Sequence, residues 1–372
     1  MSHFDVQLVP SEYIYPFRGE WWDLFGERQH YDVVIHAITL FNHSTQVLSV
    51  ESITVEGTDQ GRLLQRTVFD QEEIQLRTGP IIARDQLGLR KIVDLILWTD
   101  KAVPPEKNLS PNTELEPEHV LIFPNIYLMF HRKPDRLRVS VQVNASGRRE
   151  EAEATLRVVE YKNQVKYGFP LEGVWLLKGT PNTGVIDHHR FGMSNEFGVD
   201  FLRVSSQGKL FRGDGKRGSD YYSYGERVLA AAKGKVVAVN GTETQEWFRF
   251  NPKRGETEEQ FQERQLKEAR QALQGDVGSW AAGNYILVEH AEAEYSAYLH
   301  LKENSVRVRE GDLVQRGQHI AEVGNTGDSY GAHLHFQVID CPDLVRGRSL
   351  PFEFDNIEVS LSEPGWFVQS VD

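Results

Sequence analysis

The chain has almost no cysteine. Its 372 residues include a single one, Cys341, so no intrachain disulfide can form and the fold does not depend on an oxidising compartment. A free cysteine most often packs as a small apolar side chain, and we interpret Cys341 in that way.

Long apolar runs are also missing. No stretch of 18 or more apolar residues occurs, so the sequence predicts no membrane-spanning helix. The first residues, MSHFDVQLVPSEYIYPF, lack the basic start and apolar core of a signal peptide. No leader is therefore visible, and a cytoplasmic location is not excluded by the sequence.

An excess of positive charge is absent as well. The 41 Lys and Arg residues stand against 54 Asp and Glu residues, which gives a formal net charge of −13. Proteins that bind nucleic acid through the phosphate backbone need a basic face. This negative net charge argues against a nucleic-acid partner. It would also give no overall attraction to an anionic polymer substrate, which would have to be bound by individual residues of the site.

The length and the residue pattern indicate two domains. In residues 1–165, short runs rich in β-branched and aromatic residues alternate with turn signals, which is typical of an antiparallel β-sandwich. No motif assigns this part a role. A second β-rich domain is expected over residues 173–355, followed by a C-terminal tail at 356–372. The predicted fold class is all-β.

One segment of the second domain has a helical pattern. Thr257 and Gln260 have the spacing of a capping box, and Gly275 follows as a helix stop. Few residues of the intervening sequence are apolar, so we expect an exposed helix. It would lie in an insertion at about residues 242–282.

A short β-type run, HLHFQV, carries His333 and His335. Successive strand side chains point to opposite faces, so these two histidines project from the same face. Two imidazoles on a rigid strand suit a metal ligand and a neighbouring proton-handling group. The simpler interpretation is a pair of surface histidines, and the HxH spacing alone does not decide between them.

Two further motifs can bring polar groups to the same place. Asp200 lies early in a predicted strand, and His300 closes the strand of a predicted hairpin. A hydrolytic zinc site needs three protein ligands, an open position, and groups that move protons and stabilise an oxyanion. Together, these four residues (Asp200, His300, His333 and His335) can supply two of the ligands and both helper groups.

The second domain resembles the lysostaphin- or LytM-type zinc endopeptidases, the twenty-third family of the metallopeptidases. The resemblance rests on several motifs in the family's order, namely GVDF, ERVLAAAKGKVV, GNYILVEH, YLHL, REGDLVQRGQHIAEVGNTG and AHLHF. It covers residues 173–355 and leaves the N-terminal part without a counterpart.

The resemblance implies a role for each matching residue. Asp200 and His335 correspond to zinc ligands, and His300 and His333 to the two catalytic histidines. The implied substrate is a peptide stem or cross-bridge of bacterial cell-wall peptidoglycan. The family would predict a periplasmic or extracellular location.

The chain departs from the family at the first zinc ligand. The family has a histidine four residues before the aspartate, in HxGxD, and this chain has Glu196 there. Three interpretations follow. Glu196 ligates zinc itself, and two carboxylates then weaken the pull of the ion on bound water. Alternatively, His188 or His189 is the third ligand, or the site is degenerate.

Two functions remain open at this point. The leading hypothesis is a zinc-dependent metalloendopeptidase that cleaves peptidoglycan peptides. The alternative is a binding or regulatory module with a degenerate peptidase fold and no hydrolytic activity, which the substitution at Glu196 motivates. The sequence does not indicate an oligomeric state.

Overall fold

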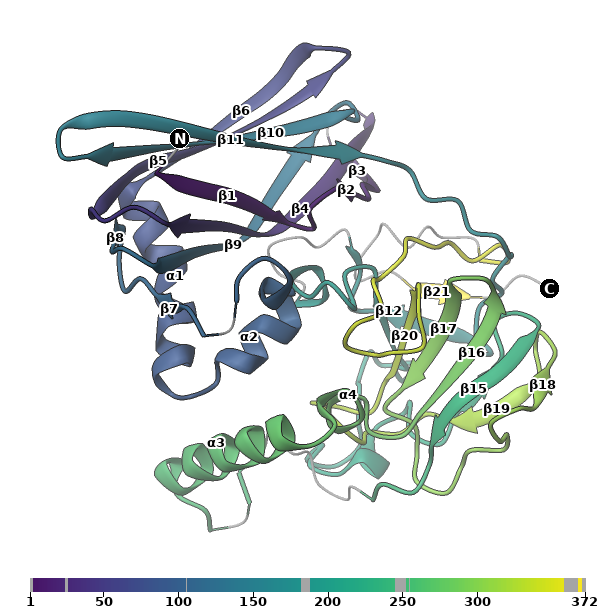
Figure 1. The fold of residues 1–372 in the computed structure, drawn as a ribbon. Helices are drawn as coiled ribbons and strands as arrows, with labels where there is room; N and C mark the ends of the chain where they lie inside the picture. The colour runs from purple at the N-terminus through teal and green to yellow at the C-terminus, as the bar shows by residue number, and fades with distance from the viewer. Residues whose placement is uncertain are drawn as a thin grey trace. The chain divides into compact units, whose positions relative to one another are not determined.

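The structure is a computed structural model that describes residues 3–23, 26–104, 106–181, 188–244, 252–253, 255–357 and 367–369, with the backbone alone for 20–23 and 26–28. The chain divides into two compact units (Figure 1). Unit 1 comprises Met1–Glu160 with Phe191–Met193, and unit 2 comprises Tyr161–Arg190 with Ser194–Asp372. Strands make up most of the regular secondary structure in both units, which confirms the predicted β-rich class.

Two sheets build unit 1. The first has the order β1-β4-β9-β7 with β3 beside β4, and the second has the order β2-β11-β10-β5-β6 with β8 beside β5. Two short pairs, β7 with β9 and β2 with β11, are parallel, and the other described pairs are antiparallel. The strands are β1 Phe4–Val9, β2 Tyr13–Ile14, β3 Phe17–Asp23, β4 Gly26–Asn42, β5 Leu48–Asp59, β6 Arg62–Asp70, β7 Asn108–Leu109, β8 Glu114–Leu115, β9 His119–Phe130, β10 Arg136–Ala145 and β11 Arg148–Val158.

The two sheets share one hydrophobic cluster. Alternate residues of β10, including Leu137, Val139 and Val141, lie in this cluster together with Ile35 and Ile38 of β4. The period of two matches the strand pattern that the sequence predicts. Each fully buried aliphatic side chain contributes about 1.5–3 kcal/mol, so this cluster is the main source of stability in unit 1.

Unit 1 also contains two helices that the strand pattern did not reveal, α1 (Gln71–Gln86) and α2 (Arg90–Leu97). The Asp70 side chain caps α1 by accepting from the backbone N–H of Glu73 at 2.9 Å. Pro80 lies inside α1, where it removes a helical donor. Helix α1 packs against β9 (Figure 1).

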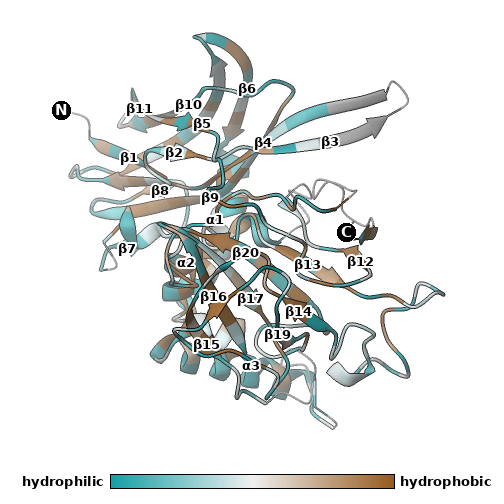
Figure 2. Ribbon diagram, turned by 90° about the vertical axis from the view of Figure 1, so that its right-hand side faces the viewer, coloured by the Kyte–Doolittle hydropathy of each residue, from teal (hydrophilic) through white to brown (hydrophobic). Residues whose placement is uncertain are grey.

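Unit 2 is organised around one sheet of the order β18-β15-β16-β17-β20-β13-β12-β21, with β14 and β19 forming a separate pair. Strands β13 and β20 are buried along their whole length, and Figure 2 shows brown, hydrophobic segments on both. The strands are β12 Val174–Leu177, β13 Val199–Leu202, β14 Arg227–Leu229, β15 Gly234–Asn240, β16 Tyr285–Ala291, β17 Glu294–Leu299, β18 Leu313–Val314, β19 His319–Glu322, β20 Leu334–Ile339 and β21 Phe367–Gln369.

The expected helix lies between β15 and β16. Helix α3 (Glu258–Gln274) begins after Thr257, whose side chain and backbone exchange hydrogen bonds with Gln260 in the predicted capping box. A second helix, α4 (Val277–Ala282), follows it. Residues 245–251 and 254 of the predicted insertion lie outside the described part of the chain. None of the described helices is long and apolar enough to cross a membrane.

The segment predicted as a C-terminal tail contributes a strand. Strand β21 pairs antiparallel with β12, with Trp175 opposite Val368. Residues 358–366 and 370–372 of the predicted tail lie outside the described residues.

Candidate functional site

Three neighbouring strands of unit 2 bring the predicted site residues together. Strand β20 lies between β17 and β13, and His335 of β20 stands directly opposite Asp200 of β13. His335 also pairs in register with Leu299, the last residue of β17. His300 is the next residue along the chain and therefore lies beside the start of β20. His333 immediately precedes β20. The sheet thus supplies a rigid base for all four side chains.

The side chains of these residues lie in contact range. Asp200 Oδ1 is 3.0 Å from His335 Nδ1 and 3.5 Å from His333 Nε2. The ring of His300 has its centroid 4.7 Å from that of His333 and 6.0 Å from that of His335. Asp200, His300 and His335 are buried.

Gln337 offers a hydrogen-bond partner to one nitrogen of the His335 ring. It lies two residues along β20, and its Oε1 atom is 2.9 Å from His335 Nε2. An amide oxygen only accepts hydrogen bonds, so a neutral ring that donates to Gln337 carries its proton on Nε2 and turns the lone pair of Nδ1 towards Asp200. Nδ1 and the carboxylate oxygen are then two acceptors 3.0 Å apart, which repel each other. A cation bound between them removes this repulsion.

Gly198 makes room for the imidazole of His335. A Cβ atom at this position would lie 2.7 Å from His335 Cε1 and 3.0 Å from Nε2. These distances are too short for real contacts. The glycine two residues before Asp200 therefore allows His335 to approach the carboxylate.

His300 and His333 are both held through Nδ1 by backbone carbonyl groups. His300 Nδ1 is 2.9 Å from the oxygen of Thr326, and His333 Nδ1 is 2.6 Å from the oxygen of Gly331. A carbonyl oxygen can only accept, so Nδ1 carries the proton in each ring. Nε2 is left as the reactive atom of both histidines.

Burial and neighbouring charges shift the pKa values of this group. Burial raises the pKa of Asp200, but the adjacent imidazoles of His189 and His333 outweigh it and hold that pKa well below its usual range. Burial lowers the pKa of His335 and places the pKa of His300 well below its ordinary value. For Asp200 and His335, an ionised carboxylate beside a neutral imidazole is the protonation state that zinc ligands require.

Glu196, the residue at the departing position, faces arginine. It is 2% exposed, and its Oε1 atom lies 3.2 Å from the Nη1 nitrogen of Arg190, which is fully buried. Burial raises the pKa of Glu196 to about 7, although Arg190 and Arg348 lower it. The structure thus gives Glu196 a charge partner of opposite sign.

His189 lies beside Asp200. It belongs to a short 3₁₀ turn, η3 (His188–Phe191), and its Nε2 atom is 3.5 Å from Asp200 Oδ1. Its ring centroid lies 4.7 Å from that of His335, and the side chain is 2% exposed. His188 is exposed and stacks on His189 at 4.1 Å.

The ligand atoms around Asp200 have a spacing that fits a zinc ion. His188, His189 and Asp200 offer ligand atoms that all lie within 4.8 Å of one another. A tetrahedral zinc with bonds of about 2.0–2.1 Å separates its ligand atoms by about 3.3 Å. The distances from Asp200 Oδ1 to His335 and His189, 3.0 and 3.5 Å, bracket that separation.

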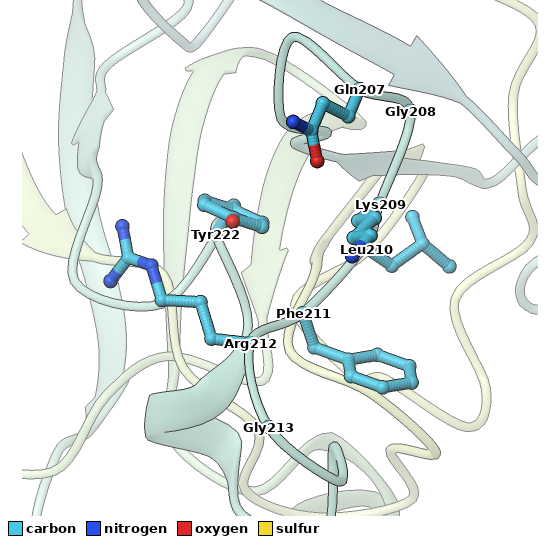
Figure 3. A pocket seen from close by; sticks show the side chains of 8 residues that line it. All are labelled: Gln207, Gly208, Lys209, Leu210, Phe211, Arg212, Gly213 and Tyr222. Atoms are coloured by element: carbon cyan, nitrogen blue, oxygen red, sulfur yellow. The ribbon is translucent and has the colours of Figure 1, made fainter.

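A loop before β14 borders the same region. A hollow on this loop is lined by residues 207–213 and Tyr222, with the Arg212 guanidinium 4.6 Å from the Tyr222 ring (Figure 3). The adjacent Tyr221 packs against Gly331, the residue whose carbonyl holds His333. None of the predicted metal ligands lines this hollow.

Sequence reasoning missed three residues that support the site, namely Gln337, Gly198 and Arg190. Gln337 shares a strand face with His333 and His335 and was visible in that periodicity. Gly198 begins the motif GVDF, but its role becomes clear only when the position of the His335 ring is known. The Arg190–Glu196 pair had no sequence signal, because it depends on the path of the chain between η3 and β13.

Comparison with known families and curated proteins identifies metallopeptidases. The model of peptidase family M23 matches residues 271–346, which confirms the resemblance that the motifs indicate. Among curated proteins, the peptidoglycan DD-endopeptidases ShyA and ShyB of Vibrio cholerae are 40% identical over 83 residues and 48% identical over 67 residues. These stretches cover 22% and 18% of this chain, and only 18% and 14% of the relatives' own lengths. An uncharacterized metalloprotease of Haemophilus influenzae is 25% identical over 52% of this chain and 42% of its own.

Solved structures show only distant likeness. The catalytic domain of lysostaphin from Staphylococcus simulans matches 50% of this chain and 87% of its own, with 21% identity and a TM-score of 0.24. A zinc-containing peptidase from Vibrio cholerae matches 94% of this chain and 85% of its own, with 15% identity and a TM-score of 0.27. Similarity at this level does not bear on the site.

Proposed function

We propose that this chain, whose residues 271–346 match peptidase family M23, is a zinc-dependent endopeptidase that cleaves peptide bonds in bacterial peptidoglycan. The relatives named as peptidoglycan DD-endopeptidases support this substrate class. The matched part of unit 2 contains His300, His333 and His335.

The observation that carries the proposal is the arrangement of acceptors around Asp200. His335 Nδ1 and His189 Nε2 lie 3.0 and 3.5 Å from the same carboxylate oxygen, close to the ligand spacing of a tetrahedral zinc. We infer that Asp200, His335 and His189 are the three protein ligands. One carboxylate and two neutral imidazoles leave the zinc site a net charge of +1. With Glu196 in place of His189, two carboxylates would cancel the charge of the ion.

The two remaining histidines would handle protons. Bound zinc would act as a Lewis acid that lowers the pKa of water and polarises the peptide carbonyl. His300 is neutral near pH 7 because burial lowers its pKa, and its Nε2 lone pair can take a proton from the attacking water. The same proton can then pass to the leaving amine.

His333 has a different environment. It is less buried than His300, and its Nε2 atom lies 3.5 Å from Asp200 Oδ1. With Nδ1 fixed on Gly331, a protonated Nε2 would donate a hydrogen bond to the oxyanion that forms on the peptide carbonyl. We assign His333 this role.

A matched set of variants tests the ligand assignment. Zinc content of the purified protein would be measured for His189→Ala, His188→Ala and Glu196→Gln. We expect His189→Ala to lose most zinc, because a ligand is removed. His188→Ala and Glu196→Gln should retain zinc, because neither residue is a ligand in this assignment and glutamine keeps a polar side chain of similar shape beside Arg190. Zinc lost in Glu196→Gln and kept in His189→Ala would overturn the assignment.

Hydrolysis is tested with peptidoglycan itself. Purified zinc-loaded protein should release soluble fragments from sacculi, and His300→Ala and His333→Ala should abolish this release while keeping zinc. The degenerate binding module, which the Glu196 substitution motivated, would instead retain zinc or peptidoglycan binding without any cleavage. A wild-type protein that binds zinc and releases nothing would remove the peptidase proposal.

A further inference from the structure

The backbone of His300 has an unusual conformation. Its φ angle is +63°, in the left-handed region that residues other than glycine rarely adopt. Its N–H group donates to the carbonyl oxygen of Ala282, the last residue of α4, at 3.0 Å. Such a conformation persists only where the surrounding structure holds it, and it occurs often at functional sites.

The position of the His300 ring depends on Thr326. The Nδ1–H group donates to the Thr326 carbonyl oxygen at 2.9 Å, and the imidazole is buried. A shift of this carbonyl would rotate the ring and move Nε2 away from His333. The groups that fix the Thr326 main chain therefore also fix the orientation of the His300 ring.

The hydroxyl group of Thr326 holds its own main chain in place. Oγ1 donates to the carbonyl oxygen of Leu301 at 2.9 Å and accepts from the N–H of Asn284 at 2.8 Å. Thr326 is 2% exposed, so both bonds are shielded from water. One hydroxyl thus connects the loop before β20 to the residue that follows His300.

Asn284 completes the connection from the other side. Its side-chain amide donates to Leu301 O at 3.2 Å and to Glu243 O at 2.9 Å, while its Oδ1 accepts from the N–H of Glu243 at 2.9 Å. The backbone N–H of Leu301 donates to Asn284 O at 2.9 Å. Asn284 is fully buried, and its amide uses both donor and acceptor groups.

Two glycines let these segments touch. Gly283 has a φ of +67°, and a Cβ atom there would lie 2.4 Å from the carbonyl carbon of Thr326. Gly327 has a φ of +76°, and its Cβ would lie 2.4 Å from Ala281 O. Side chains at either position would separate Thr326 from Asn284.

We propose that Asn284 and Thr326 are a positioning pair, which fixes His300 in its left-handed conformation with Nδ1–H on the Thr326 carbonyl and Nε2 directed at the reacting site. This proposal rests on the catalytic role of His300 proposed above. The hydrogen bonds of the pair lead to His300, Leu301 and Glu243, so it acts on the proton-handling side of the site and not through the metal ligands.

The test compares Thr326→Val with Thr326→Ser in the full-length zinc-loaded protein. Valine keeps the shape of the side chain but removes the hydroxyl, whereas serine keeps the hydroxyl. On a soluble cross-linked dimer from digested peptidoglycan, we expect Thr326→Val to lower kcat by about 10- to 100-fold, with KM and zinc content changed less than about twofold. Thr326→Ser should stay within about threefold of wild type.

Asn240→Ala serves as a matched control. The Asn240 amide donates to Gly283 O at 2.9 Å, so this variant removes a hydrogen bond from the same segment without touching His300, Leu301 or Thr326. We expect its kcat to remain near that of the wild type. A loss of kcat equal to that of Thr326→Val would show that any weakening of the segment suffices and would overturn the proposal.

Imidazole ¹⁵N NMR gives a readout that does not depend on peptidase activity. We expect His300 to be protonated on Nδ1 in wild type and to lose this single tautomer in Thr326→Val. Unchanged His300 signals or unchanged kcat in Thr326→Val would overturn the proposal. If the wild type itself is inactive, the peptidase function fails while the NMR comparison still tests the positioning. If Thr326→Val does not fold, Thr326→Ala is judged by the same criteria.

Discussion

Single hydrogen bonds decide which atoms of this site are available to a metal. The ring of His335 has two nitrogens, and a hydrogen bond from Nε2 to Gln337 leaves the lone pair of Nδ1 towards Asp200. Partners of this kind orient a ligand and raise its basicity. The same principle applies to His300 and His333, where carbonyl groups take the proton of Nδ1.

Replacement of Gln337 should weaken zinc binding. Gln337→Leu removes the acceptor from His335 Nε2, so the ring can turn or change its tautomer. We expect zinc affinity to fall about 10- to 100-fold, measured by competition with a chromophoric chelator. Gln337→Glu retains an acceptor and should lose much less. Equal affinity in the leucine variant and the wild type would contradict this role.

The short helix α4 connects the insertion to His300. Its N-terminus is capped by Asp276, which accepts from the N–H and the hydroxyl of Ser279 at 3.1 and 2.6 Å. Its last residue, Ala282, accepts from the N–H of His300. Helix α3 has an equivalent cap at Thr257, but it ends at Gln274, before α4 begins at Val277.

Removal of the two caps should therefore have different effects. Asp276→Ala and Thr257→Ala each lose a cap worth about 1 kcal/mol of local helix stability. We expect faster amide hydrogen exchange in the affected helix for both variants. Only Asp276→Ala should also lower kcat, because fraying of α4 reaches His300. A similar kcat in both variants would show that fraying of α4 does not affect His300.

The segment at the start of unit 2 is held by one buried carboxylate. Glu294 is fully buried and accepts from the hydroxyl groups of Tyr161 and Tyr167, each at 2.8 Å, and from the backbone N–H of Gln164 at 2.9 Å. These contacts attach the first residues of unit 2 to strand β17.

Glu294→Gln should destabilise unit 2. Glutamine replaces one acceptor oxygen with an NH₂ donor, and the N–H of Gln164 or Val165 then faces a donor whichever way the amide turns. We expect a loss of about 1–3 kcal/mol in the free energy of unfolding, measured by denaturant titration. Glu292→Gln, at an exposed neighbouring position, is the control and should change little.

The accuracy of the sequence prediction differs between elements for physical reasons. The run HLHFQV shows the alternation of a strand and forms most of β20, which begins one residue later at Leu334. The cap and stop of α3 lie at Thr257 and Gly275 as predicted. Helix α1 escaped notice because Gly79 and Pro80 interrupt it, although its buried residues Ile74, Thr78 and Ile81 have helical spacing.

The position of the third ligand candidate could not be predicted from motif spacing. The turn η3 places His189 beside Asp200, whereas Glu196, the residue in register with the family motif, faces Arg190. Spacing along the chain gives no information on how a 3₁₀ turn folds back onto a strand. In contrast, Asp200 and His335 lie opposite each other because their strands, β13 and β20, are regularly paired neighbours.

Across the whole molecule, acid should destabilise the fold through half-buried and buried histidines. Burial lowers the pKa of His290, which hydrogen-bonds to Lys233 O and Ser296 Oγ at 2.8 and 2.7 Å. The unfolded chain takes up this proton near its ordinary pKa of about 6.5, before the folded chain does. Stability is therefore present above that pH and is lost as pH falls towards the folded-state pKa.

Thermal and denaturant unfolding between about pH 7.5 and 5 would measure this loss. One such histidine contributes at most about 1.4 kcal/mol per pH unit. We expect His290→Gln, which cannot titrate, to show a shallower decline than the wild type in zinc-free buffer. Parallel pH dependences for the two proteins would exclude His290 as a source of the acid sensitivity.

The insertion between β15 and β16 leaves and re-enters the sheet at one point. Asn240 and Tyr285 are register partners, and the Asn240 amide bonds to Gly283 O. Closing such an excursion costs entropy that grows only slowly with its length. Helix α3 can therefore be exchanged for a foreign module, such as an affinity handle or a wall-anchoring domain. The replacement must end before Asp276, because the residues from there to Asn284 keep His300 in place.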